Sequence, residues 1–231
     1  MAKVPKSYRA HYSMGNAYLQ QNLIDQAIKE FLTSIRFKPD NIKAHNNLGI
    51  AYFEQERYDA AIREYLIAIN LRFNNAEVHN NLGLAYLKQD HHDQAIYEFK
   101  TALKFRTDYA EAYYNLGLAY RRQGHDDAAI KEYRTAIILK PDNAALHYNI
   151  GVIYFKQGRY REAISEFSIA LKLKPDFKEA HSNLEALMEK ITVRKDAGPA
   201  AASQDKNSIV DPLVKTKNQG VFSGSYNLPL F

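Results

Sequence analysis

The sequence predicts an all-α solenoid built from stacked helix–turn–helix repeats, and three observations support this fold class. First, an octet such as HNNLGLAY at 79–86 recurs in related form five times. Second, the glycines of the octets follow one another at intervals of 34 residues, a period typical of stacked helical hairpins: they are Gly15, Gly49, Gly83, Gly117 and Gly151. Third, apolar residues keep fixed positions relative to each glycine.

The first helix of each repeat is predicted around the octet. In NLGLAY the leucine, glycine, alanine and tyrosine share one helix face. Glycine costs about 1 kcal/mol relative to alanine inside a helix, so its recurrence indicates that another helix comes close. The helix should end seven residues after each glycine, where Gly and Asn suit a left-handed C-cap. The residues there are Asn22, Glu56, Asp90, Gly124 and Gly158.

Two further columns predict the second helix. A small alanine follows each glycine by twelve residues and an aromatic residue follows it by sixteen, and these side chains would fill the space between the helices. The columns are Ala27, Ala61, Ala95, Ala129 and Ala163, and Phe31, Tyr65, Phe99, Tyr133 and Phe167. Lys-Pro-Asp at 38–40, 140–142 and 174–176 should end the second helix, with the Asp capping the next one.

This pattern resembles the tetratricopeptide repeat family over residues 8–177. The resemblance implies a right-handed superhelical solenoid whose first helices line a concave groove. One departure is the column four residues before the glycine, where a large aromatic residue is usual and this chain has four histidines and Tyr113. The predicted repeats are 8–41, 42–75, 76–109, 110–143 and 144–177, after an N-terminal extension at 1–7.

The chain beyond the fifth repeat departs from the pattern. HSNLEALMEK at 181–190 has Glu185 in place of the glycine, so we predict a capping helix at 178–194, because end repeats need a polar outer face. The tail at 195–231 has no helical period and ends in the apolar and aromatic VFSGSYNLPLF. We expect the tail to dock on a partner, or to fold back into the chain's own groove.

The face opposite the packed columns carries the predicted binding site. An asparagine recurs there two residues before the glycine position: Asn47, Asn81, Asn115, Asn149 and Asn183. A carboxamide can pair with both the N–H and the C=O of a passing peptide bond. First helices about 8–10 Å apart would meet an extended peptide, which rises roughly 3.3 Å per residue, at about every third residue. The column is similar to the asparagine ladder of O-linked N-acetylglucosamine transferase repeats. The simpler alternative is that asparagine recurs only because the repeats duplicated.

Apolar and basic residues accompany the asparagines. Exposed apolar side chains edged by polar groups indicate an interaction surface, and we predict one formed by Ile50, Phe53, Leu84, Leu87, Leu118, Val152 and Phe155. Cations in the C-terminal half would orient an acidic or C-terminal carboxylate ligand, the alternative being a solvated rim: Lys88, Arg121, Arg122 and Lys156. A carboxylate clamp known in some family members is not predicted, because Tyr12, Glu77 and Asn81 stand where its cations should be.

Composition and motifs exclude several function classes. The chain has no cysteine, and the histidines of one column would have to converge within about 2.0–2.1 Å of an ion to bind zinc, so no metal or cofactor is expected. No HExxH, phosphate loop or catalytic triad pattern occurs, so we predict no enzyme activity. The net charge of +5 is too small to favour nucleic acid. No secretory signal and no apolar run of roughly 18 residues occurs, so a cytoplasmic protein is expected.

We therefore expect a protein–protein interaction module that binds extended segments of partner proteins in its concave groove. The alternative is a structural scaffold or assembly factor built into a larger complex, with the C-terminal tail docked on a partner. The chain's own tail and self-association are further candidate occupants of the groove.

Overall fold

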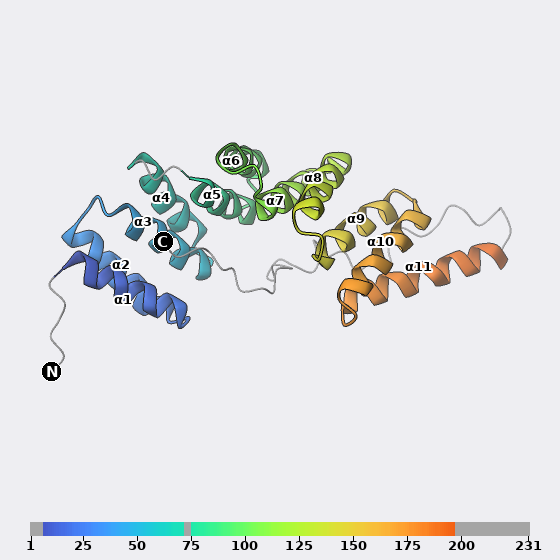
Figure 1. The fold of residues 1–231 in the computed structure, drawn as a ribbon, viewed down its shortest axis with the longest axis horizontal. Helices are drawn as coiled ribbons and strands as arrows, with labels where there is room; N and C mark the ends of the chain where they lie inside the picture. Colours follow the sequence, from blue (N-terminus) through green and yellow to red (C-terminus); the bar gives the residue numbers. More distant parts are fainter. Residues whose placement is uncertain (1–6, 72–74, 197–231) are drawn as a thin grey trace. The chain divides into compact units, whose positions relative to one another are not determined.

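The computed structural model describes residues 7–71 and 75–196, with side chains described up to residue 191. The regular elements in these residues are all helices (Figure 1), which confirms the predicted all-α repeat fold. They are α1 (Tyr8–Gln20), α2 (Ile24–Phe37), α3 (Ile42–Glu54), α4 (Tyr58–Asn70), α5 (Ala76–Lys88), α6 (His92–Phe105), α7 (Ala110–Arg122), α8 (Asp126–Leu139), α9 (Ala144–Lys156), α10 (Tyr160–Leu173) and α11 (Lys178–Asp196). None of these helices is long and apolar enough to cross a membrane.

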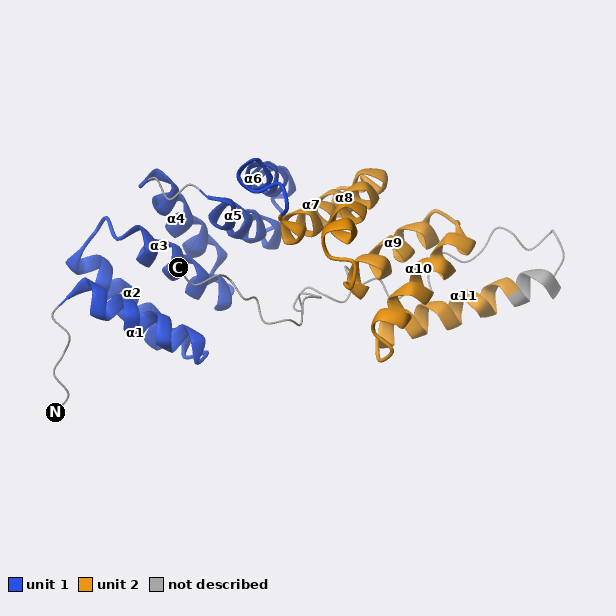
Figure 2. Cartoon of the chain, in the orientation of Figure 1, with its two compact units in different colours: residues 1–108, 226–231 blue, residues 109–225 orange. Residues whose placement is uncertain are grey.

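The chain divides into two compact units, with the boundary between Asp108 and Tyr109 (Figure 2). Unit 1 contains the helical hairpins α1–α2, α3–α4 and α5–α6, and within it α2 packs against α3 and α4 packs against α5. Unit 2 contains the hairpins α7–α8 and α9–α10, and α11 packs against α10. The sequence pattern did not predict this division, because the 34-residue register continues through it.

Close packing inside each hairpin explains the glycine column. A Cβ atom at Gly49 would lie 2.6 Å from Cε1 of Tyr65, and one at Gly83 would lie 2.7 Å from Cε1 of Phe99. The same aromatic column blocks a side chain at the other three glycines. The alanine and aromatic columns of the second helices are fully buried in all five hairpins. The predicted core columns are therefore confirmed. They determine which face of each first helix packs against the second helix of the same hairpin.

The turns within the hairpins also follow the prediction. The residue seven positions after each glycine has a positive φ angle, between 58° and 79°. Unit 1 uses Asn22, Glu56 and Asp90 at these turns, whereas unit 2 uses Gly124 and Gly158. Side chains with a Cβ atom pay roughly 1–2 kcal/mol in this conformation, so the turns of the two units differ in strain.

The predicted N-caps are displaced by one residue. The sequence placed caps at Asp40 and Asp142, but the N-cap residues of α3 and α9 are Asn41 and Asn143. Asn143 accepts a hydrogen bond from the backbone N–H of Ala145 at 3.1 Å. The Pro-Asp pairs are used by the turn itself, so each helix starts one residue later than expected.

Candidate functional site

The five predicted asparagines lie on α3, α5, α7, α9 and α11, and all of them are buried. The exposed fractions of Asn47, Asn81, Asn115, Asn149 and Asn183 range from 0% to 8%. The sequence had placed this column on a solvent-facing arc, because that arc is opposite the second helix of the same hairpin. The expected exposure is wrong: Asn47, Asn149 and Asn183 face residues on the preceding first helix of their own unit.

Hydrogen bonds between first helices hold two of these asparagines. Asn47 Nδ2 donates to the Tyr12 hydroxyl at 3.3 Å and to Asn16 Oδ1 at 2.8 Å. Asn183 Nδ2 donates to the Tyr148 hydroxyl at 3.0 Å. In both units the tyrosine precedes the asparagine by 35 residues. These two asparagines therefore join α3 to α1 and α11 to α9.

Asn149 is held by a buried cation. Arg121 Nη1 donates to Asn149 Oδ1 at 2.9 Å, and Arg121 is only 5% exposed. The sequence assigned Arg121 to a basic surface of the groove, whereas the structure places its guanidinium against the asparagine column. Two predicted site residues are thus brought together by a direct contact between α7 and α9.

Some carboxamide atoms of this face have no hydrogen-bond partner in the described part of the chain. These buried atoms are Asn46 Oδ1, Asn81 Oδ1 and Asn149 Nδ2. Asn46 lies three residues before Gly49, and its Nδ2 donates to Asn47 Oδ1 at 3.0 Å. A buried polar atom without a partner costs about 1–3 kcal/mol. Asn46 Oδ1 and Asn81 Oδ1 each need a donor, whereas Asn149 Nδ2 needs an acceptor, because its Oδ1 is already held by Arg121.

The exposed apolar strip predicted along the groove is not found in the described residues. Ile50, Phe53, Leu84, Leu87, Val152 and Phe155 are buried, and Leu118 is partly buried against the core of unit 2. The rings of Phe53 and Phe155 lie 5.3 Å from those of Tyr58 and Tyr160. Each of these rings therefore packs on the start of the second helix in its own hairpin. Their role in binding a peptide stays a prediction.

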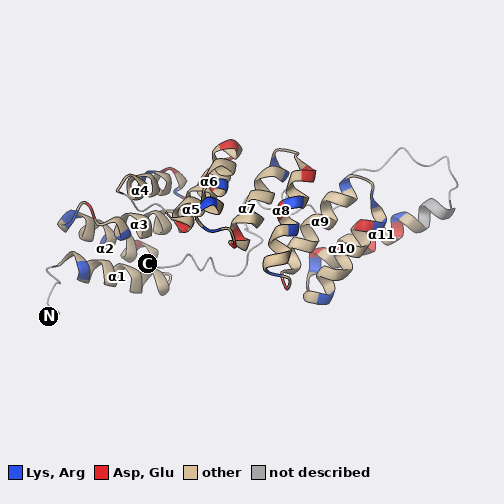
Figure 3. Cartoon of the chain, turned by 45° about the horizontal axis from the view of Figure 1, so that its top comes forward, with Lys and Arg blue, Asp and Glu red and all other residues tan. Residues whose placement is uncertain are grey.

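The remaining predicted cations reach the surface. Lys156 is exposed, and Lys88 and Arg122 are half-buried. The sequence analysis missed Lys190, which occupies the same register on α11, five residues after Glu185. Its Nζ lies 5.7 Å from the ring centroid of Phe155 on α9. Charged residues of both signs occur along the helices of both units (Figure 3).

The histidine column forms repeated pairs that the sequence analysis also missed. Nδ1 of each histidine lies 2.5–2.7 Å from a carboxylate oxygen of a glutamate 19 residues later. The pairs are His11–Glu30, His45–Glu64, His79–Glu98 and His147–Glu166. A glutamate occurs fifteen residues after all five glycines, so the two columns together carried the signal. No group of three or more metal-ligating side chains forms in the described residues.

Burial and hydrogen bonding shift the pKa of His45 in opposite directions. Burial alone lowers the pKa of its imidazole. The hydrogen bonds to Glu64 and to the backbone carbonyl of Pro39, together with the Glu64 charge, outweigh burial and raise the pKa above the usual histidine value. The histidines at this position are therefore parts of the packing between the two helices of a hairpin.

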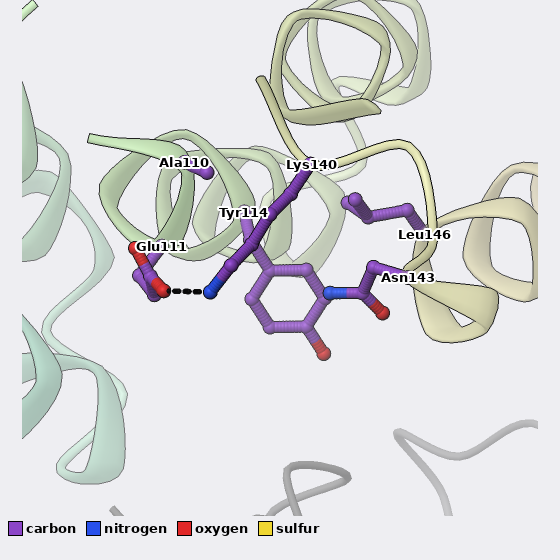
Figure 4. A pocket seen from close by; sticks show the side chains of 6 residues that line it. All are labelled: Ala110, Glu111, Tyr114, Lys140, Asn143 and Leu146. Carbon is purple, nitrogen blue, oxygen red and sulfur yellow. Dashed lines mark hydrogen bonds and ion pairs between the residues drawn. The ribbon is translucent and has the colours of Figure 1, made fainter. Parts of the chain in front are cut away.

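A shallow depression opens in unit 2 beside the start of α7 (Figure 4). It is lined by Ala110, Glu111, Tyr114, Lys140, Asn143 and Leu146. Lys140 Nζ forms an ion pair with Glu111 Oε1 at 2.6 Å across its edge. The same register in unit 1 holds the ion pair of Arg106 Nη1 with Glu77 Oε1 at 2.7 Å. A carboxylate clamp would need a cation at position 77. Here Glu77 instead forms an ion pair with Arg106.

Comparison with known sequences identifies the repeats. The TPR repeat model matches residues 15–56, 49–90, 91–124 and 117–158, and the tetratricopeptide repeat model matches residues 144–177. Together these matches cover more than half of the chain. No curated protein matches the chain as a relative.

Several solved structures share the fold. MamA is 30% identical, with a TM-score of 0.66 over 70% of this chain and 95% of that protein. PilF of Pseudomonas aeruginosa is 20% identical, with a TM-score of 0.70 over 82% of this chain and 86% of that one. YrrB, described as a TPR protein with an unusual peptide-binding site, is 20% identical, with a TM-score of 0.64 over 74% of this chain and 88% of that one. The likeness to PilF and YrrB shows the fold alone.

Proposed function

The chain belongs to the tetratricopeptide repeat family, and from that premise we propose that it binds extended segments of partner proteins along its first helices. Repeats of this family generally serve as protein-interaction scaffolds rather than as catalysts. In the proposed complex, carboxamides of the asparagine column pair with the peptide backbone of the partner. Apolar residues of the same face would contact those side chains of the partner that lie between successive backbone contacts.

The observation that carries this proposal is the set of carboxamide atoms without partners in the described residues. Asn81 Oδ1 and Asn149 Nδ2 are both buried, and both residues lie two positions before a repeat glycine. A passing peptide bond supplies one donor and one acceptor, so it can satisfy either atom. The free energy recovered, about 1–3 kcal/mol for each atom, would favour the bound state. Reaching these atoms requires neighbouring side chains to shift.

The same column contains a matched control. Asn47 already uses its Nδ2 for Tyr12 and Asn16, and its Oδ1 accepts from Asn46. In the proposal, Asn81 and Asn149 contribute more to peptide binding than Asn47 does. Asn47 mainly joins α3 to α1. Asn115 and Asn183 remain predicted backbone contacts.

The test is an affinity capture with mass spectrometry, comparing wild type with the Asn81→Ala/Asn149→Ala variant and with Asn47→Ala, all checked for folding by circular dichroism. A partner that the double variant loses and Asn47→Ala retains would then be divided into synthetic peptides, and one extended segment should reproduce the difference. Equal capture of every partner by all three proteins would contradict binding through the asparagines. In that case the partners would have to bind another surface of the protein.

The scaffold alternative has an observation of its own. Second helices expose large apolar side chains, among them Ile138 at 80%, Tyr97 at 65% and Phe37 at 57%. In this alternative the second helices and the C-terminal tail contact subunits of a larger complex, although residues 197–231 of the tail lie outside the described residues. Loss of a complex on Tyr97→Ser or Ile138→Ser, with capture unchanged in the asparagine variants, would favour this function over the first.

A further inference from the structure

The first helices of unit 2 carry a row of cations in one register, five residues after the glycine position. The row consists of Arg122 on α7, Lys156 on α9 and Lys190 on α11. In unit 1 the same register holds Gln20, Glu54 and Lys88. Desolvation raises the pKa of the Glu54 carboxyl, and the charge of Lys88 opposes this shift, so acid and base are neighbours there. The two units therefore present different charges at equivalent positions.

Two contacts link this row to the asparagine column. Lys190 Nζ lies 5.7 Å from the ring of Phe155, which directly precedes Lys156, so α11 and α9 approach each other at the row. Arg121, next to Arg122, donates to Asn149 Oδ1 at 2.9 Å. Cations and carboxamides are thus adjacent on neighbouring first helices of one unit. A single extended ligand can follow both.

The acidic residues of α11 that are closest in sequence to Lys190 occupy other parts of the helix circumference. Glu179 lies within about 20° of Lys190 around the helix but roughly 16–17 Å away along its axis. With 3.6 residues per turn, Glu185 lies about 140° around the helix from Lys190, and Glu189 lies about 100° from it. Neither shares the register of the row. From the register and these contacts we propose that unit 2 recognises an acidic extended segment of a partner protein, with side-chain carboxylates along Arg122, Lys156 and Lys190. This inference rests on the proposed function, because the asparagine column holds the backbone of the same segment.

The spacing of the row favours several carboxylates over one. First helices about 8–10 Å apart distribute the three cations over roughly 16–20 Å, so they cannot converge on a single terminal carboxylate. A chain in the extended polyproline II conformation has three residues per turn and advances about 3.1 Å per residue, so Asp or Glu at about every third residue places an acid on each cation. Single-stranded nucleic acid would instead need exposed aromatic rings for base stacking. The tyrosines of this face, Tyr114 and Tyr148, are 5% and 0% exposed.

The experiment measures fluorescence anisotropy of labelled peptides with the full chain. The probe has four Glu-Ser-Val triplets, an acetylated N-terminus and an amidated C-terminus. Its comparisons are the same peptide with Gln for Glu, a shuffled peptide with its four Glu adjacent, the Gln peptide with a free C-terminal carboxylate, and single-stranded oligothymidine. Protein variants are Arg122→Gln/Lys156→Gln/Lys190→Gln and the charge-matched Lys131→Gln/Arg161→Gln/Lys172→Gln, whose residues are exposed on α8 and α10.

We expect the spaced Glu peptide to bind on the order of tenfold more tightly than the Gln peptide, because exposed ion pairs are individually weak and three act together. The preference should disappear between roughly 0.01 M and 1 M salt, as the Debye length falls from about 30 Å to about 3 Å. The row variant should lose the preference, and the charge-matched variant should retain it.

Four results would overturn the inference: equal binding of the Glu and Gln peptides, equal loss in both protein variants, a preference for the free C-terminal carboxylate over spaced Glu, or tighter binding of oligothymidine. The proposed function is judged separately. If both peptides bind equally and Asn81→Ala/Asn149→Ala weakens both, peptide binding stands and acid recognition fails. If neither peptide binds, acid recognition by the row fails, and the affinity capture decides the function.

Discussion

Units 1 and 2 share the residues that pack each hairpin and differ in the residues of the opposite face and of the turns. Glycine, alanine and aromatic columns continue through both units. Three residues before the glycine, unit 1 has Tyr12, Asn46 and Asn80, whereas unit 2 has Tyr114 and Tyr148. The difference indicates that positions beside the asparagine column are less constrained by the fold than the packed columns.

The largest expected effect tests what the units share. In Gly83→Ala the new Cβ would lie 2.7 Å from Phe99 Cε1, and in Gly117→Ala it would lie 2.7 Å from Tyr133 Cδ1. Each change should lower the free energy of unfolding by about 1–3 kcal/mol, the usual cost of overpacking. Urea denaturation would measure both. Phe99→Leu should restore part of the loss in Gly83→Ala, and additive losses in that double variant would contradict the close contact.

The second prediction concerns the asparagine column. Asn47→Ala removes donors to Tyr12 and Asn16 and an acceptor for Asn46, so it should lower unfolding free energy by about 1–3 kcal/mol. Asn183→Ala in unit 2 should also destabilise, through its bond to Tyr148. Asn81→Ala should leave the thermal melting temperature nearly unchanged. If Asn81→Ala instead costs as much as Asn47→Ala, its assignment to ligand binding is wrong.

The third prediction exchanges the turn residues of the two units. Glu56 has a φ angle of 58° in unit 1, and Gly124 has one of 79° at the equivalent turn of unit 2. Glu56→Gly should stabilise the protein by about 0.5–1 kcal/mol, because relief of the left-handed strain exceeds the extra entropy of the unfolded chain. Gly124→Ala should destabilise by a similar amount, although a Cβ there would meet no atom within 4 Å. Chemical denaturation should show opposite signs. If both substitutions changed the free energy of unfolding in the same direction, the φ angle would not be what decides stability at these turns.

The sequence was sufficient to predict the fold because each packing contact inside a hairpin joins two columns at fixed spacing. Gly49 and Tyr65, sixteen residues apart, illustrate this. The burial of Asn47 could not be predicted in this way, since its partner Tyr12 is 35 residues earlier, in the preceding hairpin. A helical wheel for one hairpin treats that side as solvent. The His45–Glu64 pair was predictable in principle, because both residues recur in register.

The smallest expected effect is a pH dependence from the histidine column. The pKa of His45 is raised in the folded protein, where the bonds to Glu64 and Pro39 outweigh the lowering effect of burial. A raised folded pKa stabilises the fold fully below the unfolded pKa of about 6.5. This contribution is lost as the pH rises through the folded pKa. His45→Tyr, which imitates Tyr113 at the equivalent position of unit 2, should therefore cost more stability near pH 6 than near pH 9.

The measurement is the difference in unfolding free energy between wild type and His45→Tyr across that pH range. Lys43→Gln, a change at an exposed position on the same helix, serves as the control and should show no such trend. A difference that is constant with pH would mean that His45 contributes through packing alone. A difference that grows toward pH 9 would mean that burial, which favours the neutral imidazole, outweighs the bond to Glu64. The repeated pairs would then be neutral hydrogen bonds rather than charged ones.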